Sequence, residues 1–293
     1  MKKISVAIAT FNEEKNIGPC LETVKGWVDE IVVVDGNSQD KTRELAKKYG
    51  ARVIKTTNKP IFHINKQMAI DACQGEWIFQ LDADERVTPA LAEEVLKIVS
   101  MNDDNIEEYQ KTLPQRRLFL KHQKIVEKRD GKIGQARGEY AGFFIPRLNY
   151  FLGRYLRHGG AYPDGVIRLV KNSKARFPCQ SVHEQIEING RGGWLQNDLI
   201  HLADPNLSRY LVRFDRYTAL LADELEEKKL KIGFLSGLNY MLFKPLGWFL
   251  LTYFRHKGFM DGFPGFVFSF FSGLRFVVAY IKYWEKKTKG GEK

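Results

Sequence analysis

The chain has 293 residues and is 44 % hydrophobic, enough for one large domain or for a domain with an appendage. Its three cysteines lie far apart without a Cys-x-x-Cys pair, so neither a disulfide framework nor a thiolate metal site is indicated, and a reducing cytoplasm fits best. The net charge of +11 is uneven: residues 1–108 contribute −5, residues 109–176 contribute +12 and residues 177–293 contribute +4. The middle segment predicts an anionic partner, either nucleic acid or a phosphorylated or acidic lipid; the alternative is a solvated basic surface.

Strands and helices are predicted to alternate through the first hundred residues. The start resembles a signal peptide, but its apolar run at 4–9 is short and meets Asn12, so we expect a buried first strand. The other predicted strands are 31–34, 51–56 and 76–81, and the predicted helices are 13–27, 38–49 with Ser38 as its cap, 64–74 and 89–100. This alternation predicts an α/β fold whose mostly parallel sheet is flanked by helices and binds ligands at the carboxyl ends of its strands.

Polar clusters follow three of these strands: Thr10-Phe11-Asn12, Asp35 and Asp82-Ala83-Asp84. Two carboxylates one residue apart can face the same way past a strand end, and they suit a hard divalent cation already held by a phosphate. Alone, such a triplet is also typical of a solvated turn. Because the chain has neither a Gly-x-Gly-x-x-Gly fingerprint nor a P-loop, we expect a nucleotide diphosphate held by metal at Asp82 and Asp84. Lys66 is a candidate phosphate contact, or an ordinary exposed helix lysine.

The rest of the chain changes character. Residues 107–138 are basic and predict an acceptor-side loop or a disordered insertion, and residues 142–177 predict short strands and loops. Residues 207–230 predict an amphipathic helix, followed by an aromatic-rich tail. We therefore expect a catalytic domain over 1–205 and a helical, membrane-associated region over 206–293.

The first half resembles family 2 glycosyltransferases of the GT-A fold. The resemblance rests on Val6-Ala7-Ile8-Ala9-Thr10-Phe11-Asn12-Glu13-Glu14, Val32-Val33-Val34-Asp35-Gly36-Asn37-Ser38-Gln39-Asp40 and Gly75-Glu76-Trp77-Ile78-Phe79-Gln80-Leu81-Asp82-Ala83-Asp84-Glu85. The second half is similar to the lipopolysaccharide-core type, through Gly159-Gly160-Ala161-Tyr162-Pro163-Asp164, Arg168-Leu169, Val182-His183-Glu184, His201, Arg216-Tyr217 and Lys257-Gly258-Phe259-Met260-Asp261-Gly262.

This resemblance implies an inverting, metal-dependent transfer from a nucleotide sugar, commonly a UDP-sugar. By it, Thr10, Asn12, Glu13 and Asp35 line the nucleoside pocket, and Asp35 reads the base. Asp82 approaches the ribose or the metal, and Asp84 binds Mg²⁺ or Mn²⁺ across the diphosphate. A bound cation would neutralise the charge that grows on the departing diphosphate.

The resemblance also suggests the acid–base residues. Glu184 matches the family's general base, which removes the proton of the acceptor hydroxyl; the alternative is a surface carboxylate. His201 matches a late histidine that completes the metal shell; the alternative is a satisfied core histidine. The family often has an Ala-Arg-Asn run where this chain has Ile64-Asn65-Lys66-Gln67, which leaves the role of Lys66 open.

Acceptor-side residues are expected in and after the basic segment. Tyr162, Asp164 and Arg168 either bind acceptor hydroxyls or hold their loop together. His183 points away from Glu184 if that segment is extended, so only one of the two faces the sugar.

The tail predicts membrane association. Residues 262–281 are just long enough to be considered for a bilayer span, but Arg275 lies inside them. Arg275, Lys282, Lys286 and Lys289 would form one basic stripe on a helix, which predicts a helix in the interface with its basic side toward the head groups. The alternative is an aromatic helix that packs back on the protein.

The leading hypothesis is thus a cytoplasmic enzyme, peripheral on the inner face of the cell membrane, that extends a glycolipid or lipid-linked glycan beside anionic lipid. Its rivals are a polyprenyl-phosphate glycosyltransferase, which has little need of a base, a catalytically inactive scaffold, and a nucleic-acid-binding protein. Base stacking needs aromatic side chains among the cations. Phe119 is the only Phe, Tyr or Trp in 111–138, so we expect no nucleic acid partner.

Overall fold

The computed structural model describes residues 3–180 and 185–290, and the chain divides into two compact units. The first unit comprises Met1–Leu148 and Pro163–His201, and the second comprises Asn149–Tyr162 and Leu202–Lys293. The predicted functional division after residue 205 stays a prediction.

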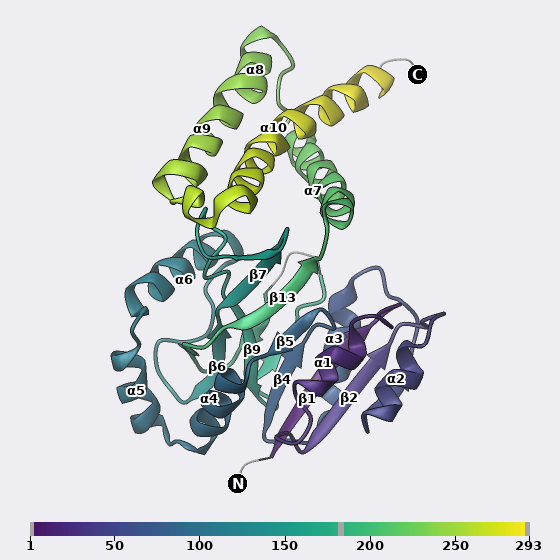
Figure 1. Ribbon diagram of the computed structural model, residues 1–293, viewed down its shortest axis with the longest axis vertical. Coiled ribbons are helices and arrows are strands. Elements are labelled where there is room, and N and C mark those ends of the chain that lie inside the picture. The colour runs from purple at the N-terminus through teal and green to yellow at the C-terminus, as the bar shows by residue number, and fades with distance from the viewer. Residues whose placement is uncertain (1–2, 181–184, 291–293) are drawn as a thin grey trace. The chain divides into compact units, whose positions relative to one another are not determined.

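A mixed sheet forms the centre of the first unit (Figure 1). Among the described residues it has seven strands in the order β12-β6-β9-β4-β1-β2-β3, with bounds β1 Ile4–Thr10, β2 Glu30–Asp35, β3 Arg52–Lys55, β4 Trp77–Leu81, β6 Tyr140–Ile145, β9 Val166–Lys171 and β12 Arg191–Trp194. Strand β1 is parallel to β2 and β4, β2 to β3, and β12 to β6, whereas β9 is antiparallel to both its neighbours. The predicted mostly parallel sheet is confirmed.

The helices of the alternating region follow the predicted order. They are α1 Ile17–Glu22, α2 Thr42–Lys48, α3 Phe62–Ala72 and α4 Pro89–Ser100. The start of α4 is as predicted, because Thr88 Oγ accepts from the Leu91 amide and Pro89 occupies the first helical position. The predicted cap at Ser38 is wrong: α2 begins four residues later, because Ser38 binds a carboxylate instead.

Close backbone contact lets β4 lie beside β1. A Cβ atom on Gly75 would lie 2.7 Å from the Ser5 amide nitrogen, so only glycine fits between α3 and β4. Both strands are buried along almost their whole length, and Phe79 and Ile8 belong to the core beneath α1 and α4. The core thereby fixes the places where β1, β2 and β4 end.

The predicted loop or disordered insertion over 107–138 is wrong. The segment forms helices α5 Asp103–Thr112 and α6 Arg116–Asp130. Phe119 and Val126 lie seven residues apart on one face of α6 and are buried, and Phe119 stacks on Trp194 of β12 with ring centroids 4.6 Å apart. The run of cations hides this apolar stripe in the sequence, because the lysines and arginines occupy the solvent face.

Shorter strands complete this unit and lead into the next. Strand β5 Glu85–Val87 pairs antiparallel with β13 Leu199–Asp204, and β10 Ala175–Arg176 pairs with β11 Glu187–Ile188. In the second unit, β8 Arg154–Leu156 pairs antiparallel with the end of β7 Arg147–Phe151.

The rest of the second unit is helical (Figure 1). The helices are α7 Leu207–Glu227, α8 Phe234–Leu238, the π-helix η1 Asn239–Phe243, α9 Lys244–Leu250, the π-helix η2 Leu251–Arg255, the 3₁₀ turn η3 Gly258–Asp261 and α10 Gly262–Gly290. One described stretch, Gly258–Thr288, is long and apolar enough to cross a bilayer by length and composition alone.

The basic stripe predicted on α10 has acidic partners within the protein, and its contact with head groups stays a prediction. Lys282 and Lys286 pair with Asp215 and Asp223 on α7, and Lys287 pairs with Glu226. Arg275 lies over the Trp248 ring, 4.4 Å from its centroid. The acidic residues of α7 that pair with these lysines cannot be read from the pattern of the tail alone.

Candidate active site

Asp35 fastens the end of β2 to the end of β1. The Ser38 and Thr10 hydroxyls donate to Oδ2 at 2.5 and 3.2 Å, and the Ser38 amide and the Arg43 guanidinium donate to Oδ1 at 2.9 Å. Burial acts to raise the pKa of Asp35, but hydrogen bonds from Ser38, Arg43 and Thr10 outweigh it and lower that pKa. The carboxylate is fully buried, so contact with a base would require it to exchange one of these partners. The proposed base-reading role stays a prediction.

The loop after β1 lies against the loop after β2. Asn12 has a left-handed backbone (φ 55°), its amide donates to Ser38 Oγ at 2.8 Å, and its side-chain oxygen accepts from the Gln39 amide. The Glu13 amide donates to Thr42 Oγ1. Thr10, Asn12, Glu13 and Asp35 are thus brought together, as their positions at neighbouring strand ends predict. Ser38 and Arg43, which sequence reasoning missed as site residues, hold them there.

Asp82 follows β4 and pairs with two buried cations. Lys66 Nζ lies 2.5 Å from Oδ1, and Arg168 Nη2 lies 2.6 Å from Oδ2. Burial acts to raise the pKa of Asp82, but attraction to Arg168 and Lys66 outweighs it and lowers that pKa well below the usual value. Lys66 is therefore a buried site residue and not an exposed helix lysine.

A third carboxylate, Glu85, completes this network. It is fully buried, it accepts from Arg168 at 2.7 Å and from the Asp82 amide at 2.9 Å, and Arg147 lies 3.6 Å away. Arg147 also pairs with Asp164 at 2.9 Å. Sequence reasoning missed Glu85 and Arg147. The position of Glu85 directly after Asp84 is the one signal that could have pointed to it.

Asp84 lies beside His201. The His201 Nε2 atom is 3.7 Å from Asp84 Oδ2. Burial, together with the charges of Asp82, Glu85 and Glu13, raises the pKa of Asp84 to about 7. Burial, assisted by Arg147, lowers the pKa of His201 to about 3, so its imidazole is neutral and suited to bind a metal.

The residues at this place fit a divalent cation. Asp84 is a half-buried carboxylate with other carboxylates nearby, a concentration of negative charge that a cation would offset. Carboxylate oxygen with imidazole nitrogen is a donor set suited to Mn²⁺. Both Asp82 oxygens already have cationic partners. Residues 3–180 and 185–288 contain no cluster of three His, Cys, Asp or Glu side chains that could hold a metal, so a substrate would have to supply further ligands.

The expected acceptor residues have separate locations. Arg168 is buried under the Asp82 carboxylate, which fits the second of its two predicted roles, holding the site together. Asp164 pairs with Arg147 in the first unit. Tyr162 belongs to the second unit, where Arg157 lies over its ring. His183 and Glu184 lie outside the described residues.

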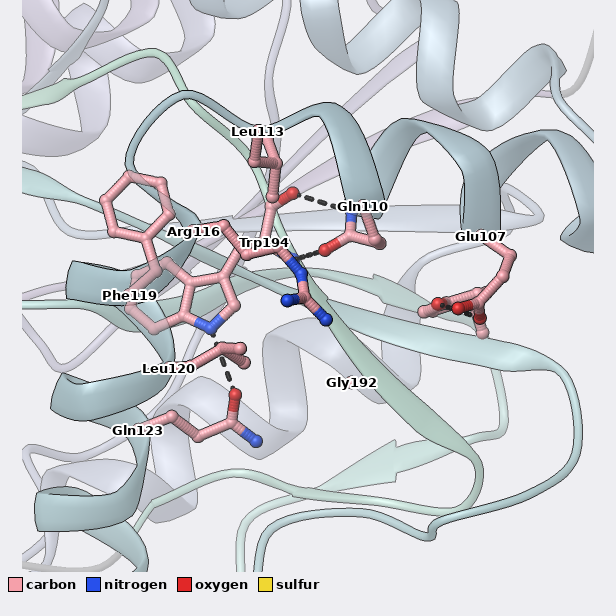
Figure 2. Close-up of a pocket in the computed structure, with 10 residues that line it drawn as sticks. Glu107, Gln110, Leu113, Arg116, Phe119, Leu120, Gln123, Gly192 and Trp194 are labelled. Atoms are coloured by element: carbon pink, nitrogen blue, oxygen red, sulfur yellow. Dashed lines mark hydrogen bonds between the residues drawn. The ribbon is translucent and has the colours of Figure 1, made fainter.

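A small cavity of about 130 Å³ lies between α5, α6 and β12 (Figure 2). Gln110 exchanges two hydrogen bonds with the Trp194 backbone, and the Trp194 indole N–H donates to Gln123. No residue of the strand-end site lines this cavity. Its polar contacts hold the basic helices against the sheet.

Known proteins match this chain along most of its length. The lipopolysaccharide core biosynthesis glycosyltransferase LpsC of Rhizobium meliloti is 26 % identical over 290 residues, covering 93 % of this chain and 91 % of the relative. An uncharacterized glycosyltransferase of Rickettsia typhi is 26 % identical over 281 residues, covering 94 % and 85 %. Among solved structures, glucosyl-3-phosphoglycerate synthase from Mycobacterium tuberculosis is 25 % identical with a TM-score of 0.30, over 33 % of this chain and 39 % of that one.

The family model named glycosyl transferase family 2 matches residues 5–151, which is half of the chain. The match includes the ends of β1, β2 and β4 with the polar clusters that follow them. The sheet, its flanking helices and this match agree with the GT-A fold expected from the motifs. The chain is a glycosyltransferase that belongs to glycosyl transferase family 2.

Proposed function

We propose that this protein moves a sugar, with inversion, from a nucleotide sugar to a hydroxyl of a lipid-linked or lipopolysaccharide-core-type glycan at the cytoplasmic face of the membrane. The observation that carries the proposal is the half-buried Asp84 carboxylate beside a neutral His201, at the edge where β1, β2 and β4 end. Ligands of parallel sheets bind at that edge. Similarity to a lipopolysaccharide core glycosyltransferase over nearly the whole chain supports the glycan acceptor.

In this proposal the loops after β1 and β2 bind the nucleoside of the donor, which we propose to be uridine. Their mutual hydrogen bonds, among them Asn12 amide to Ser38 and Glu13 amide to Thr42, fix the pocket before any ligand arrives. A preformed pocket binds more tightly, because less conformational entropy is lost on binding.

Asp84 and His201 would hold Mg²⁺ or Mn²⁺, with Asp82 approaching the metal or the ribose. The bound ion would supply Lewis-acid stabilisation of the charge that develops on the departing diphosphate. Lys66 lies beside Asp82 and would add a second positive charge near that diphosphate.

Glu184 is proposed as the general base that removes the acceptor proton, and Tyr162, Asp164 and His183 as acceptor contacts. If the acceptor is instead a polyprenyl phosphate, its oxygen is already ionised and no base is needed. The two acceptor classes therefore differ in their dependence on Glu184.

Calorimetric titration of UDP in the presence of Mn²⁺ tests the donor site. Wild type and the control Asp71→Asn, which changes an exposed carboxylate on α3, should bind UDP alike. Asp84→Asn should lose at least about tenfold in affinity, because a neutral amide is a poor ligand for a hard cation. Equal affinity in all three proteins would contradict the metal role of Asp84. A thermal-shift screen of nucleotide sugars with Mn²⁺ would then identify the donor, since ligand binding stabilises the folded state.

A further inference from the structure

The helices of the second unit expose an unusual amount of apolar surface. Between Ile232 and Trp284 the sequence contains a single carboxylate, Asp261. On η1, α9 and η2, the side chains of Leu242, Leu246, Leu250 and Phe254 are 45 to 56 % exposed. These four side chains are spaced by four residues. The π-helical turns η1 and η2 on either side of α9 contain more residues per turn than an α-helix, so side chains four residues apart stay on the same side of the segment. This row of side chains is as apolar as a protein core but is exposed to solvent.

The row continues onto α10. The segment from η1 to η2 and helix α10 run antiparallel, as shown by the ring contacts Tyr240 with Tyr280 and Tyr253 with Phe266 (Figure 1). The ring of Tyr253 contacts those of Phe254, Phe259 and Phe266, so these aromatic side chains form one continuous cluster at the turn. We call the following exposed side chains the apolar face: Leu242, Leu246, Leu250, Phe254, Phe259, Met260, Phe263, Phe266 and Phe270.

Positive charge borders the apolar face at its turn. Arg255 and Lys257 are exposed between Phe254 and Phe259, and neither forms an ion pair within the described residues. Arg154 lies beside the start of α10, 3.4 Å from the place a Cβ would take on Gly262. The nearby carboxylate, Asp261, is buried and accepts from the His158 ring and from the amides of residues 157 and 158. Within the described part of the second unit, the charges exposed around the turn are thus positive.

A bilayer span by α10 conflicts with its contacts. The second half of α10 packs along α7, and Lys282 and Lys286 pair with acids there. Helix α7 also bears Arg209, Arg213 and Arg216. A span would place these charges at the depth of the hydrocarbon, which is costly. A helix pair that lies in the plane of the interface avoids that cost, because only its apolar face leaves water.

We propose that the apolar face, with Arg154, Arg255 and Lys257 at its turn, is a monotopic docking surface for a bilayer that contains anionic lipid. The aromatic and aliphatic side chains enter the head-group boundary, and the three cations contact lipid phosphates. The inference deepens the proposed membrane location, and it differs from the sequence-based expectation because the stripe of lysines on α10 takes no part.

Co-sedimentation of the full chain with vesicles tests this surface. Wild type should bind phosphatidylcholine vesicles that contain phosphatidylglycerol, and bind pure phosphatidylcholine at least about tenfold more weakly, since each cation near an anionic surface adds attraction. The double variant Leu246→Ser/Leu250→Ser should lose at least about tenfold in partitioning, because two exposed leucines no longer enter the interface. Arg255→Glu/Lys257→Glu should lose binding to the anionic vesicles to a similar degree.

Matched controls sit on the other unit. Leu118→Ser/Ile125→Ser changes two exposed aliphatic side chains of the basic helix α6, and Lys47→Glu/Lys48→Glu reverses two exposed cations of α2. Both should bind vesicles as wild type does. Circular dichroism and thermal melting of each variant establish that it is folded.

The proposal is overturned if the α6 controls lose binding while the α9 variants keep it. It is also overturned if wild type binds neither kind of vesicle and forms a dimer that the Leu246→Ser/Leu250→Ser substitutions dissociate, since a second copy would then cover the apolar face. Asp84→Asn should bind vesicles normally. Failure of the donor assignment would therefore leave the vesicle result intact, and the two proposals fail independently.

Discussion

The guanidinium of Arg168 lies 2.6 Å from the Asp82 carboxylate, on a buried strand that runs antiparallel to the strand preceding Asp82. The same guanidinium bonds Glu85 at 2.7 Å. The carboxylates of Asp82 and Glu85 lie three residues apart and would repel each other, and Arg168, which pairs with both, offsets that repulsion. The ion pair between Arg168 and Asp82 therefore fixes the orientation of the Asp82 carboxylate toward a ligand.

Replacing Arg168 by leucine should cost about 3–5 kcal/mol of the free energy of unfolding, because the fully buried Glu85 carboxylate loses its closest cation and Asp82 loses one of its two. Urea titration measures the loss. The double variant Arg168→Leu/Glu85→Leu should recover part of it, since one stranded charge is removed as well. If Arg168→Leu unfolds like wild type and raises only the KM for acceptor, then Arg168 contacts the acceptor and does not hold the carboxylates.

A pH-dependent stability difference is expected from Asp35. Its pKa is lower in the folded state than in the unfolded chain, so its stabilising effect is complete above about pH 4, the ordinary value for an aspartate, and is lost as pH falls through the lower folded value. Asp35→Asn should destabilise the protein by about 1.5–3 kcal/mol at pH 7, the worth of hydrogen bonds to a charged group. Thermal melts from pH 7 to pH 3 should show the two proteins converging only below pH 4. The control Glu22→Gln, on the surface of α1, should follow wild type throughout.

The sequence predicts the positions of these residues better than their partners. Asp35, Asp82 and Asp84 follow buried β-branched or aromatic runs, and period-two alternation is enough to place them at one edge of a sheet. Arg43 and Arg168 approach them from a helix and from an antiparallel strand. Such approaches depend on tertiary packing, which no local period reports, so the pairing of Asp82 with two cations was not expected.

Phe119 tests the corrected view of the basic segment. Phe119→Ala should cost about 3–5 kcal/mol, because the ring is buried between α6 and Trp194 and its loss leaves a cavity. Ile125→Ala, on the exposed side of the same helix, should change stability by less than about 0.5 kcal/mol. Equal and small effects in denaturant titrations would restore the loop interpretation of residues 107–138.

That segment shows why the prediction failed. Residues 107–138 are rich in lysine and arginine, and such a composition favours a loop or disorder. The helix is indicated instead by two buried side chains seven residues apart, Phe119 and Val126. Periodicity outweighs composition once a partner surface exists, here the Trp194 face of β12. The partner follows some 70 residues later, so the segment alone cannot reveal it.

Glu184 separates the two acceptor classes. Glu184→Gln should retain UDP affinity and lower kcat by about 10²–10⁴-fold if a hydroxyl is the acceptor, because the amide cannot take its proton. Donor binding by calorimetry and turnover by UDP release give the two quantities. Near-normal turnover with a polyprenyl phosphate would instead favour the phosphate acceptor, whose oxygen needs no base.

Lys286 distinguishes the observed packing of α10 from the head-group contact that the sequence predicts. It pairs with Asp223 of α7, and both side chains are partly exposed, so Lys286→Glu should lower the free energy of unfolding by only about 0.5–1 kcal/mol. The swapped variant Asp223→Lys/Lys286→Asp keeps the net charge and should regain most of that loss. Its binding to phosphatidylglycerol vesicles should equal that of wild type, whereas Lys257→Glu should weaken it. The opposite result would be that Lys286→Glu leaves stability unchanged and weakens vesicle binding as strongly as Lys257→Glu does. In that case the lysines of α10 contact lipid, and the apolar face is not the surface that binds the bilayer.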